Sequence, residues 1–217
     1  LGHKEFWALD LEVTPEVLIP RPETECLVER ALEILAAVND SGRKRILELG
    51  TGSGAILLAL ASENPRHAYW GTDVSAGAIR VAQRNAIRHG LAENMRFIVA
   101  DWFAPFAARA NVFDMIVSNP PYIKSEVLEQ LQPEIKAFEP LVALDGSADG
   151  LRYLRHIIHS AHLYLKPGGR LFLEMGHDQK APLSQIIDRC GQYEDISFYT
   201  DYSGYDRIVA MRKNAKY

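Results

Sequence analysis

The segment that decides the fold runs Arg45-Ile46-Leu47-Glu48-Leu49-Gly50-Thr51-Gly52-Ser53-Gly54 and continues from Ala55 to Ser62. Its first five residues are largely apolar and predict a buried β-strand, and the three glycines predict a tight turn directly after it. The small and apolar residues that follow predict a helix that ends before Pro65. A strand, a glycine turn and a helix in this order are the first unit of a doubly wound α/β sheet.

The remaining elements continue this alternation along the chain. Strands are expected at His67–Thr72, Met95–Ala100, Phe113–Val117, Arg170–Met175, Asp195–Thr200 and Arg207–Arg212, and helices near 23–38, 75–90, 150–165 and 179–190. Residues 123–149 should form short helical pieces and loop, and residues 166–169 a turn. The last two strands are too close for a crossover helix, so the final strand should be antiparallel to its neighbour.

We therefore expect an α/β fold, with a doubly wound, Rossmann-like sheet that is mostly parallel and carries a terminal antiparallel strand. A β-hairpin between Lys4 and Ile19, more edge than core, should precede it. Residues 1–20 are interpreted as a hairpin linker segment and residues 21–217 as the main domain.

Composition limits the possible classes of protein. The chain has 217 residues, 47% of them hydrophobic and 24% charged, which suits one globular domain. No apolar run is long enough to cross a membrane. The net charge of −4 argues against stable, sequence-independent binding to nucleic acid. Two cysteines form no disulfide framework, which indicates a reducing, cytoplasmic environment. The chain begins at Leu1 rather than Met, which indicates a fragment or a processed chain.

Distinctive residues follow four expected strands: the glycine loop, Asp73, Asp101-Trp102, and Asn119-Pro120-Pro121-Tyr122. Ligands of an open parallel sheet bind outside the carboxyl ends of its strands, so these residues should meet at one site. Asp73 could accept from ribose hydroxyls or cap a helix. Asp101 could accept from an adenine amino group, and Trp102 could cover a ring face or belong to the core.

The Asn119 to Tyr122 turn predicts a binding site for an NH2 group. Two prolines lack backbone donors and stiffen an extended chain, so carbonyl oxygens gather beside the Asn119 side chain. Tyr122 adds an aromatic wall. Such acceptors suit a planar amide or amine, although Asn and Pro are also common in ordinary loops.

Two other interpretations start from the residues alone. Gly50, Gly52 and Ala55 match dinucleotide-binding spacing, with Asp73 about 20 residues further on, so a nicotinamide oxidoreductase is one alternative. His156, His159 and His162 share a helix, but no carboxylate or cysteine is spaced to complete a metal site with them, so no metal is expected.

Several motifs in order resemble one known family. The run from Glu48 to Gly54 is similar to motif I of class I methyltransferases that use S-adenosylmethionine, and Asn119 to Tyr122 to their amino-methylating NPPY motif. Together with Phe6-Trp7, Leu18 to Glu25, Asp101-Trp102-Phe103 and Phe138-Glu139-Pro140, the chain resembles the HemK/PrmC family, protein-(glutamine) methyltransferases of peptide chain release factors. Members of that family carry an N-terminal helical domain, which this sequence is expected to lack.

The resemblance implies a role for each matched residue. The glycine loop would surround the methionyl part of S-adenosylmethionine through Gly50, Thr51, Gly52, Ser53 and Gly54. Asp73 would bind the ribose, Asp101 and Trp102 the adenine, and Asn119 both cofactor and substrate. After methyl transfer the cofactor would leave as S-adenosylhomocysteine. Asn119, Pro120, Pro121 and Tyr122 would hold the glutamine of the release factor's Gly-Gly-Gln motif. The roles of Arg21, Glu25 and Glu139 stay open. Residues 21–217 would then be the catalytic domain.

Both lines of argument lead to one expected mechanism. The Asn119 side chain and the Pro120 carbonyl each accept one N–H of the glutamine amide, which turns its nitrogen toward the methyl group, while Tyr122 packs on the amide plane. The alternatives are a nucleic-acid amino-methyltransferase acting on adenine or guanine, the oxidoreductase above, and a non-enzymatic binding module. The first would need to flip its base and hold the backbone, for which no basic module is visible.

Overall fold

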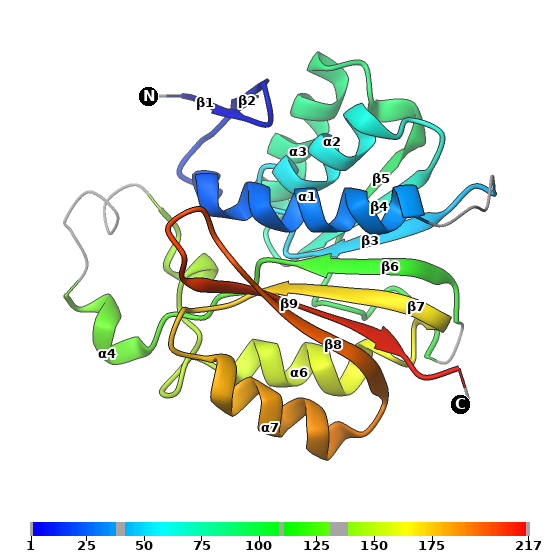
Figure 1. Ribbon diagram of the computed structural model, residues 1–217. Helices are drawn as coiled ribbons and strands as arrows, with labels where there is room; N and C mark the ends of the chain where they lie inside the picture. The colour runs from blue at the N-terminus through cyan, green and yellow to red at the C-terminus, as the bar shows by residue number, and fades with distance from the viewer. Residues whose placement is uncertain (1, 38–41, 109–110, 131–138, 216–217) are drawn as a thin grey trace.

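The computed structural model describes residues 2–37, 42–108, 111–130 and 139–215 (Figure 1). Within these ranges one sheet has seven strands: β3 (Arg45–Leu49), β4 (Ala68–Asp73), β5 (Met95–Val99), β6 (Phe113–Ser118), β7 (Leu165–Glu174), β8 (Tyr193–Thr200) and β9 (Asp206–Lys213). Their order is β5-β4-β3-β6-β7-β9-β8. The chain thus moves outward from β3 to β5 and returns to the other side of β3 as β6, which makes the β3–β6 gap the topological switch point.

Strand direction agrees with the sequence-based expectation. Neighbouring strands from β5 through β7 are parallel, whereas β9 is antiparallel to both β7 and β8. The terminal antiparallel strand is confirmed, and it lies inside the sheet, between β7 and β8. The mostly parallel, doubly wound sheet is likewise confirmed.

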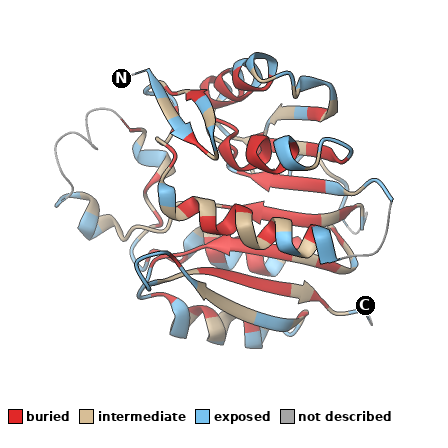
Figure 2. Ribbon diagram, turned by 45° about the horizontal axis from the view of Figure 1, so that its top comes forward, coloured by how far each residue is buried: buried red, intermediate tan, exposed pale blue. Residues whose placement is uncertain are grey.

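Helices cover both faces of the sheet (Figure 1). α1 (Pro22–Ala37), α2 (Ala55–Glu63) and α3 (Ala76–Arg88) lie on one side, and α6 (Arg152–Ala161) and α7 (Lys180–Cys190) on the other. Successive strand residues enter opposite cores: Ile46 and Val117 join the cluster under α1 and α2, whereas Leu47 and Ile116 join the cluster under α6 and α7. The strands are therefore buried on both sides (Figure 2), as a sheet with helices on both faces requires.

The N-terminal hairpin is shorter and more deeply packed than the sequence suggested. It consists of β1 (His3–Phe6) and β2 (Leu9–Glu12), and the expected extension to Ile19 is wrong. Phe6 and Leu11 are fully buried in the same cluster as α1 and α2, so the hairpin contributes to the core. The weak apolar alternation beyond Glu12 instead reflects Val13 and Val17, which pack on α3.

Other boundaries differ locally. β7 begins at Leu165, and the four residues expected to form a turn are an irregularity within it, because Phe113 pairs with Leu165 but Met115 with Arg170. The helix expected over residues 150–165 ends at Ala161, and β8 begins at Tyr193. Short pieces are η1 (Ala92–Asn94), α4 (Ser125–Leu128) and η2 (Leu141–Ala143). Val38, Phe138, the rest of 131–138 and residues 1 and 216–217 lie outside the described residues.

No helix in the described ranges is both long enough and apolar enough to span a bilayer.

Asn85 of α3 joins the hairpin to the glycine loop. Its amide nitrogen donates to the carbonyl oxygens of Glu12 (3.0 Å) and Ser53 (3.0 Å), and its amide oxygen accepts from the Glu12 N–H (2.8 Å). The side chain is fully buried, so these three hydrogen bonds are shielded from water. Asn85 therefore fixes the hairpin relative to the loop that follows β3.

We expect Asn85→Ala to lower the free energy of unfolding by roughly 2–4 kcal/mol, because it leaves the half-buried backbone groups of Glu12 and the buried carbonyl of Ser53 without partners. Urea denaturation followed by circular dichroism measures the loss. Gln83→Ala, at an exposed position of the same helix, is the matched control and should change stability by less than about 0.5 kcal/mol. Equal effects of the two substitutions would contradict the assigned role of Asn85.

Candidate active site

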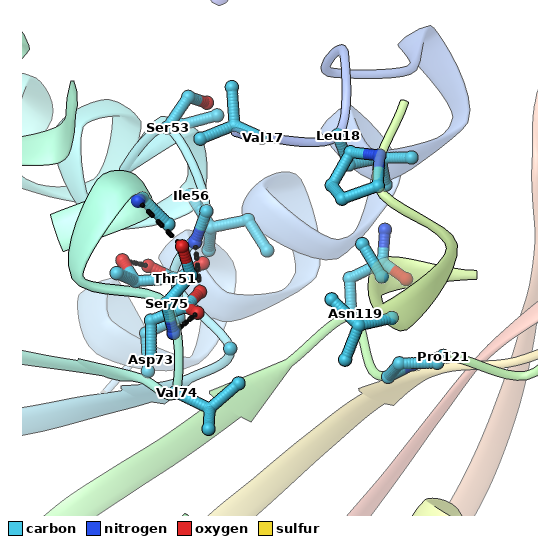
Figure 3. Close-up of a pocket in the computed structure, with 18 of the residues that line it drawn as sticks. Val17, Leu18, Thr51, Ser53, Ile56, Asp73, Val74, Ser75, Asn119 and Pro121 are labelled. Atoms are coloured by element: carbon cyan, nitrogen blue, oxygen red, sulfur yellow. Dashed lines mark hydrogen bonds between the residues drawn. The ribbon is translucent and has the colours of Figure 1, made fainter. Parts of the chain in front are cut away.

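A cavity opens at the carboxyl ends of the parallel strands, beside the β3–β6 switch point. Its wall comes from the loops after β3, β4, β5 and β6, from the first turn of α1, and from residues within 16–21 and 140–143. Figure 3 shows Thr51, Asp73 and Ser75 on one side of this hollow and Asn119 and Pro121 on the other. The loops that sequence reasoning singled out thus meet at one place.

Strand register explains why these loops meet. Leu49 pairs with Thr72 on one side and with Ser118 on the other, and Ser118 pairs with Leu173. The next residue of each strand, namely Gly50, Asp73, Asn119 and Glu174, therefore reaches the same edge of the sheet. The Ser118 hydroxyl donates to the Leu49 carbonyl (2.7 Å) and joins β6 to β3 there.

Nine sequence-predicted site residues line the cavity: Gly50, Thr51, Gly52, Ser53, Asp73, Asp101, Trp102, Asn119 and Pro121. Three others do not belong to the lining. Gly54 precedes α2 and packs against Ala82, Pro120 is buried within the turn, and Tyr122 points its hydroxyl toward β7.

The glycine loop has a left-handed backbone at all three glycines, with φ of 70° at Gly50, 53° at Gly52 and 83° at Gly54. A side chain would strain each of these conformations, which explains the glycine pattern. The Gly50 and Thr51 N–H groups donate to the Thr72 carbonyl (2.8 and 3.0 Å). The loop is therefore attached to the end of β4.

Asp73 holds both neighbouring loops through its carboxylate. Oδ2 accepts from the Gly52 N–H and Oδ1 from the Ser75 N–H, each at 2.9 Å. Burial raises the pKa of Asp73, and these two backbone hydrogen bonds act against that shift. Each oxygen keeps a lone pair that can accept from a ligand hydroxyl. Ser75 caps α3 as expected, by accepting from the Ala78 N–H.

Glu48 is an acid buried beneath the glycine loop. It is 2% exposed and accepts a short hydrogen bond from the Thr51 hydroxyl (2.5 Å). Burial raises the pKa of Glu48 to about 8, and the nearby charge of Asp73 adds to this shift. The floor of the cavity therefore gains negative charge only as the pH rises through about 8.

Apolar and aromatic groups form the part of the cavity beyond Asp73. The Trp102 ring lies 5.2 Å from the Tyr153 ring, and Trp102 has a left-handed backbone with φ of 46°. Such a conformation is uncommon for a bulky residue and often occurs at functional sites. Val74, although 60% exposed, also lines the cavity. Trp102 and Val74 can cover the faces of a flat ring.

Asn119 belongs to a chain of hydrogen bonds that extends into the core. Its Nδ2 donates to Thr24 Oγ1 (3.3 Å), the Thr24 hydroxyl donates to Glu174 Oε2 (2.7 Å), and the Tyr122 hydroxyl donates to Glu174 Oε1 (2.9 Å). No described residue donates to Asn119 Oδ1 or to the Pro120 carbonyl oxygen. Two acceptors of the turn therefore have no internal partner within the described chain.

The residues whose roles were left open have structural partners. Arg21 binds Glu139 at 2.6 Å, and Glu25 accepts from the Trp7 N–H (2.9 Å). Glu174, Val74 and Tyr153 were not singled out from the sequence, and Thr24 was named only as part of the run from Leu18 to Glu25. A sequence signal existed for Val74, because it directly follows Asp73. No such signal existed for the contact between Glu174 and Thr24, because the two residues lie 150 positions apart and meet only in the folded chain.

The described residues contain no cluster of three or more His, Cys, Asp or Glu side chains that could hold a metal ion. His156 lies beside the Trp102 and Phe103 rings, and His162 beside Tyr193. His159 Nδ1 lies 2.8 Å from the Arg155 carbonyl.

Comparison with known proteins identifies the relatives of this chain. A family model described as a methyltransferase domain matches residues 40–212. The release factor glutamine methyltransferase of Agrobacterium fabrum is 42% identical, over 98% of this chain and 73% of its own length. That of Geobacter sulfurreducens is 43% identical, over 98% of this chain and 71% of its own length.

A solved structure supports the fold. The human methyltransferase 10 domain containing protein superposes with a TM-score of 0.70, covering 97% of this chain and 90% of that one. At 17% sequence identity, this similarity concerns the fold alone.

The buried acid Glu48 should make stability depend on pH. Its folded pKa of about 8 exceeds the ordinary value of 4.5, so the folded state holds a proton that the unfolded state has lost. This contribution is fully present below about pH 4.5 and is lost as the pH rises through about 8. Glu48→Gln keeps an acceptor for Thr51 and cannot ionise. The variant should therefore become more stable relative to wild type as pH rises from 5 to 8, by roughly 1 kcal/mol or more.

Thermal unfolding of the ligand-free protein at several pH values measures this difference. Glu126→Gln, at an exposed position of α4, is the control and should show no comparable trend. A stability difference between wild type and Glu48→Gln that stays constant over pH 5–8 would refute the shifted pKa.

Proposed function

This chain belongs to the release factor glutamine methyltransferase family, and we propose that it transfers a methyl group from S-adenosylmethionine to the side-chain amide nitrogen of the glutamine in the Gly-Gly-Gln motif of peptide chain release factors. One observation carries this proposal. Asn119, whose Oδ1 accepts no hydrogen bond from the described residues, faces the same cavity as the glycine loop and Asp73 (Figure 3).

The cavity fits the chemical parts of S-adenosylmethionine. Asp73 offers carboxylate oxygens to ribose hydroxyls, and Val74 and Trp102 offer apolar surface to the adenine. The glycine loop and Glu48 surround the methionyl part, where backbone dipoles and the acceptor oxygens of Glu48 suit a cationic ligand. When bound, the cofactor supplies an electrophilic methyl group on a positively charged sulfur.

Asn119 solves the main difficulty of methylating an amide. An amide nitrogen is a weak nucleophile because its lone pair is delocalised into the carbonyl. Asn119 Oδ1 and the Pro120 carbonyl can each accept one N–H of the substrate, which fixes the plane and direction of the amide. The same acceptors stabilise positive charge that develops on the nitrogen, by roughly 3 kcal/mol per well-placed group in comparable sites.

The other residues of the turn support this geometry. Pro121 lines the cavity and can cover the apolar stem of the glutamine side chain. Tyr122 holds the turn against β7 through its hydroxyl bond to Glu174. Gly54 and Pro120 contribute through the backbone, Gly54 by permitting the left-handed start of α2 and Pro120 by stiffening the turn.

We propose no stable nucleic-acid partner and no membrane partner. Among the residues that line the described cavity, the acids Asp73 and Asp101 disfavour a phosphate backbone, and the whole chain carries a net charge of −4. The proposed reaction belongs to the cytoplasm, where peptide chain release takes place. The cysteines, Cys26 and Cys190, are both free, in accordance with a reducing environment.

A methyl-transfer assay with labelled S-adenosylmethionine tests the proposed function. We expect label in a purified release factor and none in a variant whose motif reads Gly-Gly-Ala. Transfer RNA and duplex DNA, assayed in parallel, should remain unlabelled. Label in the nucleic acids with none in the release factor would replace this function by exocyclic-amine methylation.

Asn119→Ala should lower kcat by about 100-fold or more, because it removes an acceptor that acts on the reacting nitrogen. Cofactor affinity, measured by isothermal titration calorimetry, should change by less than about threefold, since Asp73 and the glycine loop remain. Asn94→Ala, at a half-buried position in η1 outside the cavity lining, is the matched control and should keep wild-type kcat. Equal losses in kcat and cofactor affinity, or an unchanged kcat, would contradict this role of Asn119.

A further inference from the structure

Glu174 is a buried acid to which the mechanism above gives no part in recognising the substrate. It ends β7, is 1% exposed, and accepts hydrogen bonds from two hydroxyls, those of Thr24 and Tyr122. A buried carboxylate is costly unless such donors surround it. Its position one residue beyond the Ser118–Leu173 pair puts it beside the turn that contains Asn119.

The Thr24 hydroxyl has a fixed direction. A hydroxyl has one hydrogen, and at 2.7 Å from Glu174 Oε2 that hydrogen is committed to the carboxylate. Thr24 Oγ1 can therefore only accept from its other neighbour, Asn119. Thr24 is 3% exposed, so bulk water does not compete for this contact.

This direction decides which end of the Asn119 amide is bound to Thr24 and which end is left for a ligand. The NH2 end must point to Thr24, as the 3.3 Å contact from Nδ2 shows, and Oδ1 then points away from Thr24. In the opposite orientation an amide oxygen would face the hydroxyl oxygen of Thr24, and the Asn119 NH2 group would meet the NH2 group of the substrate. Both contacts would be unfavourable, the first between two acceptors and the second between two donors.

We propose that Thr24 and Glu174 are positioning residues that keep Asn119 Oδ1, rather than its NH2 group, turned toward the amide of the substrate. This inference rests on the proposed function. It assigns to the first turn of α1 and to the end of β7 a direct part in amide recognition, although neither side chain needs to touch the reacting atoms. Tyr122 strengthens the arrangement, because it holds the second oxygen of the same carboxylate.

Substitutions at Thr24 separate orientation from packing. Thr24→Val keeps the shape and removes the hydroxyl, so both orientations of the Asn119 amide become accessible; we expect kcat to fall by roughly 10- to 100-fold with cofactor affinity changed by less than about threefold. Thr24→Ser restores the hydroxyl and should return kcat to within about threefold of wild type. Thr200→Val, at an exposed position of β8, is the matched control and should keep wild-type kcat.

A double-mutant cycle shows whether Thr24 acts through Asn119. In the Asn119→Ala background no amide remains to be oriented, so adding Thr24→Val should change kcat by less than about twofold. Independent losses that multiply in the double variant would overturn the proposal, because they would mean that Thr24 contributes through packing alone. A Thr24→Val enzyme with wild-type kcat would also overturn it.

Nuclear magnetic resonance provides a test that does not depend on activity. The side-chain NH2 signals of Asn119 are assigned in 15N-labelled protein by their loss in Asn119→Asp. These protons should exchange with water faster in Thr24→Val than in wild type and in Thr24→Ser, and faster also in Glu174→Ala. Exchange rates that are equal in all variants would overturn the proposal. If the variants show this exchange pattern but the wild-type protein fails to methylate a release factor, the proposed function is refuted and the positioning role of Thr24 and Glu174 stands.

Discussion

The structure depends on one geometric constraint: β3 and β6 are neighbours whose following chains leave in opposite directions. After β3 the chain turns into α2 through left-handed glycines, and after β6 it leaves the sheet at Asn119 because two prolines follow. The space between the two departing loops is the cavity. Register places the next residues of β4 and β7 at the same edge. The positions of Asp73 and Glu174 are therefore set by strand pairing and do not depend on loop conformation.

Three buried or half-buried acids stabilise this edge of the sheet. Each one accepts hydrogen bonds from the loops or helices around it. Glu48 holds Thr51 beneath the glycine loop, Asp73 joins that loop to α3, and Glu174 joins α1 to the turn after β6. Acids suit this work because each carboxylate accepts several hydrogen bonds at once. Two of them, Glu48 and Asp73, also line the cavity where a cationic cofactor is proposed to bind.

The sequence predicts much of this arrangement, for physical reasons that can be named. The glycine loop is encoded locally, since left-handed backbone demands glycine, and the polar strand ends must meet because parallel strands end at one edge. The Thr24–Glu174 contact could not be predicted, because it joins residues 150 positions apart whose meeting depends on helix placement. Likewise, the apolar alternation near the N-terminus indicated a long hairpin, whereas Val13 and Val17 pack on a helix rather than in a strand.

The three hydrogen bonds of Asn85 couple the position of the N-terminal hairpin to that of the glycine loop. One side chain is hydrogen-bonded to both the β2 backbone and the Ser53 carbonyl, so seating of the hairpin and closure of the glycine loop are coupled equilibria. Coupling free energies are reciprocal. A cofactor that stabilises the closed glycine loop must therefore also stabilise the packed position of the β1–β2 hairpin. Displacing the hairpin must weaken cofactor binding by the same free energy.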